Sequence, residues 1–188
     1  MEYFENEKNA RDYIKMCEGY DGQELVELLR QHLPDQSTLL ELGIGPGTDF
    51  EILKNHYRVT GSDFSSTFLK LYHEKDPEAN LIQLDAVTMA TEQLFDGIYS
   101  NKVLHHLSRE DLKTSLANQY NRLNENGILL HSFWHGNKEE THHGMRFIYY
   151  TEEQLSRLFQ PQFTILYMAR YSEMDEQDSV VLIAKRNQ

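Results

Sequence analysis

The sequence predicts an α/β fold, with helices on both faces of a doubly wound, mainly parallel sheet of seven strands. Strand-like segments alternate with segments of helical periodicity through most of the chain. Three of the strand candidates end on an acidic or amide side chain, Asp63, Asp85 and Asn101. The last two candidates, 163–171 and 179–185, have no helical segment between them, so we expect an antiparallel C-terminal strand.

The first half of the chain predicts a helix and then three strands. Asp21, with Glu24 three residues later, is typical of a capping box, and leucines then recur at helical spacing until Pro34 stops the run. The following elements are strands at 38–42, 57–63 and 79–85, with helices at 48–55 and 64–76 between them. Alternation of this kind favours right-handed crossovers between parallel strands.

The second half continues the alternation with one interruption. Thr151 and Gln154 form a second capping-box pattern, and Ser108 with Asp111 forms another helix start. Residues 135–150 have no clear period, and we interpret them as an insertion or a loop. The other expected elements are strands at 95–101 and 127–134 and helices at 108–123 and 151–159.

Length and composition are those of one globular domain, 1–188, with 39% hydrophobic and 26% charged residues. No apolar run approaches the roughly 20 residues that span a bilayer, and the first residues are too polar for a signal peptide. The single cysteine, Cys17, excludes an internal disulfide and a CxxC motif, which favours the reducing cytoplasm.

The net charge of −12, from 30 acidic and 18 basic residues, points away from polyanionic partners. A field of this sign repels nucleic acid backbones and anionic membranes, although it leaves a local basic patch open. We therefore expect a small-molecule partner and a monomer or homodimer.

A glycine-rich turn follows the first strand candidate, in the stretch LLELGIGPG (39–47). A strand, a glycine turn and a helix start together form a nucleotide site, and Asp63 lies 20 positions after Gly43, as in NAD-binding proteins. The glycines fall at 43, 45 and 47 rather than in a GxGxxG register, and position 48 is Thr. In addition, the carboxylate of Glu41 would repel a pyrophosphate.

A cationic nucleoside fits these residues better. In a doubly wound sheet ligands bind beyond the carboxyl ends of the strands, where Glu41, Asp63 and Asp85 would meet. Three carboxylates suit a ligand with an ammonium group, a ribose diol, an adenine amine and a sulfonium. The ligand so described is S-adenosylmethionine (SAM).

Five segments of the chain, in order, are ELGIGPG (41–47), GSDFS (61–65), LDA (84–86), FDGIYSNKVLHHL (95–107) and RLNENGILLHSFW (122–134). In order and spacing they resemble the successive motifs of class I SAM-dependent methyltransferases, and the resemblance runs from about residue 21 to the C-terminus. It is closest to compact enzymes of this family that act on small molecules. The resemblance implies a Rossmann-like fold, SAM as cofactor and transfer of its methyl group.

The resemblance also implies the roles of individual residues in holding SAM. The backbone of Gly43, Gly45 and Gly47 would approach the methionine and ribose parts, and Glu41 would hold the amine. The remaining implied contacts are Asp63 with the ribose hydroxyls, Phe64 with the adenine ring, Asp85 and the Ala86 backbone with the adenine edge, and Ser100 and Asn101 with the methyl end. For Asp63 and Asp85 a turn or cap role is the alternative.

The N-terminal segment, 1–34, precedes these motifs, and we expect it to cover the cofactor site. Tyr13 and Tyr20 could cover the pocket there, with Tyr20 as the candidate contact, and a core or surface position is the alternative for both. The acceptor would enter between this segment, the loop after 95–101 and the insertion at 135–150. The aromatic and apolar side chains expected to line that entrance are Trp134, Met145, Phe147, Tyr149 and Tyr150, the last two with a core position as the alternative.

Histidines supply the candidate general bases, because the unperturbed pKa of a neutral imidazole suits proton removal at neutral pH. His105 and His106 follow the strand at 95–101, where the methyl group would emerge, and His131 and His135 come next. Each has packing as its alternative. The nine histidines show no HExxH or similar ligand spacing, so we expect no metal.

Three hypotheses remain from the sequence. The first is a SAM-dependent methyltransferase that acts on a small molecule. The second is an NAD-dependent Rossmann oxidoreductase, against which the glycine register speaks. The third is a SAM-binding sensor or partner subunit without catalysis, which would keep the same cofactor contacts.

Overall fold

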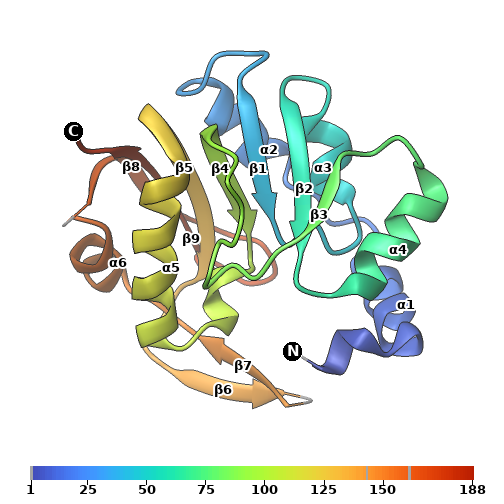
Figure 1. The fold of residues 1–188 in the computed structure, drawn as a ribbon. Helices are drawn as coiled ribbons and strands as arrows, with labels where there is room; N and C mark the ends of the chain where they lie inside the picture. Colours follow the sequence, from blue (N-terminus) through green and yellow to red (C-terminus); the bar gives the residue numbers. More distant parts are fainter. Residues whose placement is uncertain (1, 143, 161) are drawn as a thin grey trace.

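A computed structural model describes residues 2–142, 144–160 and 162–188. Its centre is a seven-stranded sheet in the order β3-β2-β1-β4-β5-β9-β8, with helices on both sides (Figure 1). The strands of this sheet are β1 (Thr38–Leu42), β2 (Arg58–Asp63), β3 (Leu81–Gln83), β4 (Phe95–Asn101), β5 (Leu123–Trp134), β8 (Phe163–Tyr171) and β9 (Ser179–Arg186). The helices are α1 (Glu7–Met16), α2 (Gln23–Arg30), α3 (Thr48–Leu53), α4 (Ser66–Lys75), α5 (Arg109–Arg122) and α6 (Glu152–Phe159), with 3-10 turns η1 (Glu2–Glu5) and η2 (Leu104–His106).

The strand directions confirm the predicted fold class. β1 is parallel to both β2 and β4, and the parallel pairing continues to β3 on one side and β5 on the other. β9 is antiparallel to both of its neighbours, β5 and β8. The first strand, β1, therefore lies inside the sheet, and the strand order reverses between β1 and β4.

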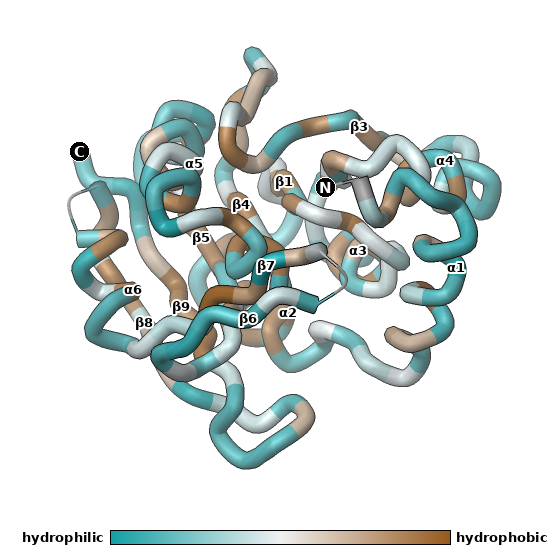
Figure 2. The backbone as a smooth tube through the Cα atoms, turned by 90° about the horizontal axis from the view of Figure 1, so that it is seen from below, coloured by the Kyte–Doolittle hydropathy of each residue, from teal (hydrophilic) through white to brown (hydrophobic). Residues whose placement is uncertain are grey.

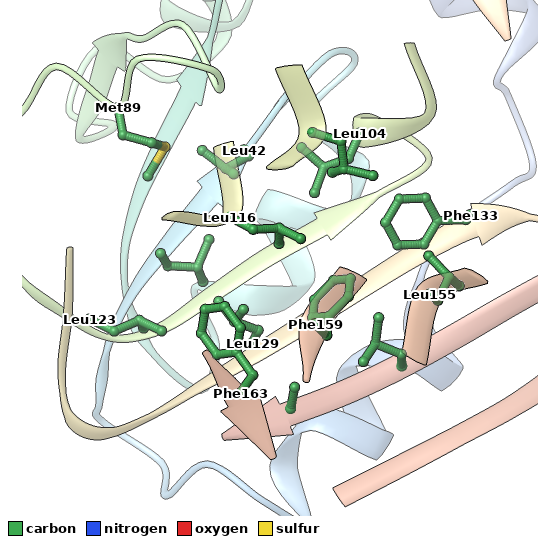
Figure 3. Close-up of a cluster of buried hydrophobic side chains, with 14 of the residues drawn as sticks. Leu42, Met89, Leu104, Leu116, Leu123, Leu129, Phe133, Leu155, Phe159 and Phe163 are labelled. Carbon is green, nitrogen blue, oxygen red and sulfur yellow. The ribbon is translucent and has the colours of Figure 1, made fainter. Parts of the chain in front are cut away.

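Two apolar layers hold the helices to the sheet, because side chains alternate between the faces of each strand. On one face, α5 and α6 pack Leu116 and Phe159 against Leu129 and Phe133 of β5 (Figure 3). The other face of the sheet is covered by α2 and α3. Their buried side chains, such as Leu29, form a second hydrophobic cluster with the strands. Figure 2 shows the apolar stretches mainly in the interior strands and hydrophilic residues along α1.

Helix starts are mostly where the sequence predicts them. Ser108 caps α5, and Thr151 and Gln154 form a complete capping box at α6. The prediction for α2 is wrong in its cap residue, since the N-cap is Gly22. The carboxylate of Asp21 instead accepts a hydrogen bond from the N–H of Gln23, over 3.0 Å, just before the first turn.

Residues 135–150 contain a hairpin, although their sequence has no clear period. Its strands, β6 (Glu139–His142) and β7 (Met145–Ile148), pair antiparallel outside the main sheet. Most side chains of β6 and β7 are partly or fully exposed, so no apolar alternation marks them. β5 also begins earlier than expected, at Leu123 rather than 127.

The hairpin and the N-terminal segment both lie at the end of the sheet toward which the parallel strands point, the lower end in Figure 1. The ring nitrogen Nδ1 of His106 lies 2.7 Å from the carbonyl oxygen of Arg146, which joins η2 to β7. On the other side, the hydroxyl of Ser65 donates to the carbonyl of Phe4 over 2.9 Å and so ties η1 to the start of α4. None of the helices among the described residues is long and apolar enough to cross a membrane.

Candidate functional site

A cavity of about 350 Å³ opens at the carboxyl ends of β1 and β2, beside the switch in strand order. It brings together two of the predicted glycines and both strand-end aspartates. The predicted residues that line it are Gly43, Gly45, Asp63, Phe64, Asp85, Ala86 and His106. Phe4 and Tyr13 of the N-terminal segment close its outer side.

Asp63 holds the glycine turn in place from the neighbouring strand. Its Oδ2 accepts a hydrogen bond from the N–H of Gly45 over 3.0 Å, and its Oδ1 accepts from the N–H of Ser65 over 2.9 Å. Gly45 has a φ of 47°, and the nearest atom to a Cβ there would be a ring carbon of Tyr13 at 4.0 Å. The backbone at Gly45 is therefore open to a ligand, as its glycine predicts.

Gly47 lies apart from this cavity. It is the N-cap of α3 with a φ of 80°, and a Cβ at this position would lie 2.1 Å from the ring of Tyr72. Gly47 is not among the residues that line the described cavities. Its glycine is explained by the left-handed backbone and the packed tyrosine, so a ligand contact is not needed.

The far end of the cavity is built by Phe64 and Asp85. The Phe64 side chain is 42% exposed, which is unusual for a phenylalanine and leaves its ring available to a ligand. The Oδ1 of Asp85 accepts from the N–H of Val87 over 2.7 Å, so Asp85 forms a turn and also lines the cavity. The turn role of Asp85 is thus present, and its contact with the adenine stays a prediction.

A second chamber of about 140 Å³ adjoins the first and shares the glycine turn with it. Glu41 lines this chamber, is only 3% exposed, and its Oε2 has no hydrogen-bond partner among the described residues. Burial, together with repulsion from Asp49 and Asp63, raises the pKa of Glu41 well above its usual 4.5. A cation placed in this chamber would remove that penalty.

Asp49 is a site residue that sequence reasoning missed. Its carboxylate accepts from the N–H of Gly22 at 2.7 Å, from the hydroxyl of Tyr99 at 2.6 Å and from the Asn101 amide at 3.0 Å. Asp49 therefore fixes Asn101, which lines the second chamber together with Tyr20. An acid in the first turn of the helix after the glycines is the only local sign of this role.

Ser100 and Asn101 point to different places, since neighbouring residues on a strand face opposite sides. The Ser100 hydroxyl lies in the core, 2.8 Å from Nδ1 of His131. The Nε2 of His131 lies 2.8 Å from the side-chain oxygen Oε1 of Gln119, and burial lowers the pKa of His131 to about 3. His131 is thus a neutral core residue, and only Asn101 of the predicted pair lines a cavity.

A third chamber of about 440 Å³ lies under the hairpin and the N-terminal helix. Its walls are mainly aromatic and apolar, and they include Trp134, Met145 and Phe147 as the sequence predicts. Tyr150 is buried in the core against Phe133, and the Tyr149 hydroxyl lies 3.3 Å from Glu140. Tyr13 and Lys102 line all three chambers, so the chambers meet at these two residues.

His105 and His106 both line the third chamber, but they differ in the hydrogen bonds of their ring nitrogens. His105 is buried, its ring stacks 5.3 Å from that of Phe147, and neither of its nitrogens has a hydrogen-bond partner among the described residues. Since a carbonyl only accepts, the Nδ1 of His106 donates to Arg146, which leaves the lone pair on Nε2. Burial lowers the pKa of both imidazoles, so both are neutral at neutral pH.

Lys102 is the second site residue that the sequence did not reveal. It follows Asn101 with a φ of 55°, and this left-handed turn directs its side chain inward, where it is 11% exposed. Its ammonium forms an ion pair with Glu173, donates to the Ser179 hydroxyl over 2.7 Å and lies 3.6 Å from the ring centre of Trp134. Burial lowers the pKa of Lys102 although Glu173 acts in the opposite direction.

Metal ligands do not gather in the described part of the chain, which holds no group of three or more His, Cys, Asp or Glu placed to bind an ion. His142 lies in the third chamber, and its neighbour His143 lies outside the described residues.

Comparison with known proteins gives three consistent similarities. A family model described as a methyltransferase domain matches residues 39–127. The trans-aconitate 2-methyltransferase of Variovorax paradoxus (strain S110) is 32% identical over 129 residues, which cover 66% of this chain and 48% of the relative. The chain thus spans about half the length of the curated relatives it matches.

Solved structures share the fold at low sequence identity. The 1,6-didemethyltoxoflavin-N1-methyltransferase of Burkholderia thailandensis superposes with a TM-score of 0.75 at 20% identity, covering 95% of this chain and 87% of the other. An S-adenosylmethionine-dependent methyltransferase from Clostridium acetobutylicum ATCC 824 gives a TM-score of 0.75 at 15% identity, over 96% and 98% of the two chains.

Proposed function

We propose that the chain transfers a methyl group from SAM to a small molecule, since residues 39–127 match a methyltransferase domain model and the sheet has the class I strand order. The match of residues 39–127 to this model confirms the resemblance carried by the five sequence motifs. SAM carries the methyl group on a sulfonium. After transfer, the sulfur leaves as part of S-adenosylhomocysteine. The protein has to hold this group, exclude water and place an acceptor in line with the methyl carbon.

The unpartnered carboxylate of Glu41 is the observation that carries the proposal. A buried acid without a donor is costly unless a ligand supplies one. An ammonium group supplies both the donor and the opposite charge, whereas the repulsion among Glu41, Asp49 and Asp63 would oppose a pyrophosphate. The second chamber therefore suits the amine of SAM and disfavours the NAD-dependent alternative.

The other predicted contacts fit the same ligand along the first cavity. Asp63 uses each oxygen for one backbone N–H, and each keeps a lone pair for a ribose hydroxyl. Phe64 offers an exposed ring to the adenine, and Asp85 and Ala86 line the same end. Gly43 and Gly45 line both chambers. A Cβ at Gly43 would lie 2.5 Å from Val103, so Gly45 is the one that leaves open space for the ligand.

We assign the third chamber to the acceptor, since it meets the other two at Tyr13 and Lys102. His106 lines both the first cavity and the acceptor chamber and presents an unprotonated Nε2. It is the better candidate for a general base, because the nitrogens of His105 are enclosed in the wall of the chamber. His106 would take the proton that the acceptor loses as the new bond forms.

The test is calorimetric titration with S-adenosylhomocysteine, with NAD in a parallel experiment. We expect stoichiometric binding of the first compound, no heat with NAD, and loss of binding in Asp63→Ala. Asp175→Ala, an exposed aspartate of the β8–β9 loop, is the matched control and should bind normally. Binding of NAD in place of S-adenosylhomocysteine would overturn the proposal. Formation of S-adenosylhomocysteine from SAM with an acceptor separates an enzyme from a binding subunit.

A further inference from the structure

The charges around the acceptor chamber restrict the kind of molecule that it takes. The question depends on the proposed function, which makes this chamber the place of the acceptor. Its described lining residues include two carboxylates, Asp12 and Glu173, and one ammonium, Lys102. Two acids against one base leave a net negative charge before any ligand enters.

The ammonium of Lys102 already has partners within the protein for its donors. An ammonium has three N–H donors. Those of Lys102 are directed to Glu173, to the Ser179 hydroxyl and to the face of Trp134, 3.6 Å from its ring centre. The hydroxyl of Tyr171 also donates to the same Glu173 oxygen, over 3.2 Å. No donor of Lys102 is left for a carboxylate of a ligand.

Three imidazoles line the chamber. His142 lies 3.4 Å from the carboxylate of Glu140, and the other two supply no positive charge. Burial keeps His105 and His106 in their neutral form, and His106 offers an acceptor through the lone pair of its Nε2. The remaining walls are largely rings and thioethers, which favour flat apolar surface, among them Tyr13, Trp134, Phe147 and Met145.

We propose that the acceptor is a small aromatic molecule with a basic nitrogen, and that the chamber excludes carboxylates. Trans-aconitate, which the curated relatives methylate by name, is a tricarboxylate and would not fit these charges. The nitrogen reacts in its unprotonated form. Its lone pair forms the new bond to the methyl carbon, the carbon–sulfur bond breaks with its electron pair left on sulfur, and Nε2 of His106 takes the proton from nitrogen.

The test uses three probes with one ring and three charges, 2-phenylethylamine, 2-phenylethanol and phenylacetate, with trans-aconitate as a fourth. They are titrated into protein loaded with S-adenosylhomocysteine. Trp134 is the only tryptophan of the chain and lies in the chamber wall, so its fluorescence reports binding. We expect the amine to bind more tightly than phenylacetate by about tenfold, and trans-aconitate to give no change.

Glu173→Gln is the decisive variant, because it removes the carboxylate and leaves Lys102 unpaired. The preference for the amine should then fall or reverse toward phenylacetate. Glu176→Gln, at an exposed position of the same loop, is the control and should keep the original order. Asp12→Asn, on the exposed side of α1, is a second test variant in case Glu173→Gln does not fold. It should also weaken binding of the amine.

Two failures can be told apart. If S-adenosylhomocysteine does not bind, the proposed function falls with the inference. If it binds but phenylacetate or trans-aconitate binds as tightly as the amine, or if no aromatic probe changes the fluorescence of Trp134, only the inference on the acceptor is wrong.

Discussion

The carboxylate of Asp49 accepts a hydrogen bond from the backbone N–H of Gly22, 27 residues earlier in the chain, over 2.7 Å. This contact joins the start of α2 to the helix that follows the glycine turn. The same carboxylate holds Tyr99 and Asn101 of β4. One side chain thus aligns three segments around the chamber assigned to the methionine end of SAM.

Asp49→Ala should therefore lower both stability and cofactor affinity. Removing the carboxylate leaves the buried Tyr99 hydroxyl and the Gly22 N–H without an acceptor, which costs about 2–4 kcal/mol of unfolding free energy. Urea unfolding measures this loss, with Asp175→Ala as the control. An unchanged midpoint would show that Asp49 is not the link between these segments.

Glu41→Gln should raise stability and abolish binding of S-adenosylhomocysteine. The pKa of Glu41 is higher in the folded protein than its usual 4.5, so the stability it gives is present below that value and lost as pH rises through the folded pKa. At neutral pH the neutral amide avoids this loss, worth about 1–3 kcal/mol of unfolding free energy. Urea unfolding should show a gain at neutral pH that shrinks in acid.

Binding of S-adenosylhomocysteine should release a proton from Glu41. Burial and neighbouring acids raise the pKa of Glu41, and the ligand ammonium would lower it again, so the proton leaves in the pH range between the two pKa values. The affinity should rise with pH, and the observed heat should depend on the ionisation enthalpy of the buffer. Equal heats in all buffers at a pH near neutrality would mean that Glu41 is already ionised.

Gly45 and Gly47 should respond differently to replacement by alanine. Both glycines have a positive φ, so each variant carries backbone strain of about 1 kcal/mol. Gly47→Ala adds a collision with Tyr72 and should lower the melting temperature further, without loss of affinity in the folded fraction. Gly45→Ala meets no protein atom closer than 4.0 Å, and its methyl group should instead reduce affinity for S-adenosylhomocysteine. The reverse pattern would place Gly47 at the ligand.

His106→Ala should slow methyl transfer by about 100-fold and leave binding of S-adenosylhomocysteine intact. Because burial lowers the pKa of His106 below its usual 6.5, the ratio of parent to variant rates should stay level as pH falls through 6.5 and decline only in more acid solution. Single-turnover rates across pH measure this, with exposed His73→Ala as the control. A pH profile of unchanged shape in His106→Ala would leave the imidazole a positioning role only.

Much of the site could be predicted because the residues concerned stand at strand ends. Parallel strands bring their carboxyl ends to one edge, so Glu41, Asp63 and Asp85 had to lie near each other whatever the loops did. Cap residues such as Ser108 and Thr151 were equally local signals. The implied contacts with SAM, the cytoplasmic location and the monomer or homodimer stay predictions.

What the sequence did not reveal depends on partners far along the chain. Asp49 and Lys102 gain their roles from Gly22 and from Glu173, which no local pattern links to them. The spacing of Gly47 predicts a ligand contact in the same way as its neighbours, whereas the ring of Tyr72 that fills the space of its Cβ comes from another helix, which no local pattern indicates. The hairpin at 139–148 was missed because its exposed side chains carry no periodic apolar signal.

The acceptor chamber and the cofactor cavity share Tyr13, Lys102 and His106 but differ in most of their other walls. Strand ends and the glycine turn supply most of the cofactor walls, whereas the acceptor chamber takes residues from α1, from the β6–β7 hairpin and from the β8–β9 loop. Substitutions in those peripheral segments alter the acceptor walls without touching the sheet. The protein is thus a modular starting point for evolution or engineering, in which substrate range can drift while the cofactor half stays fixed.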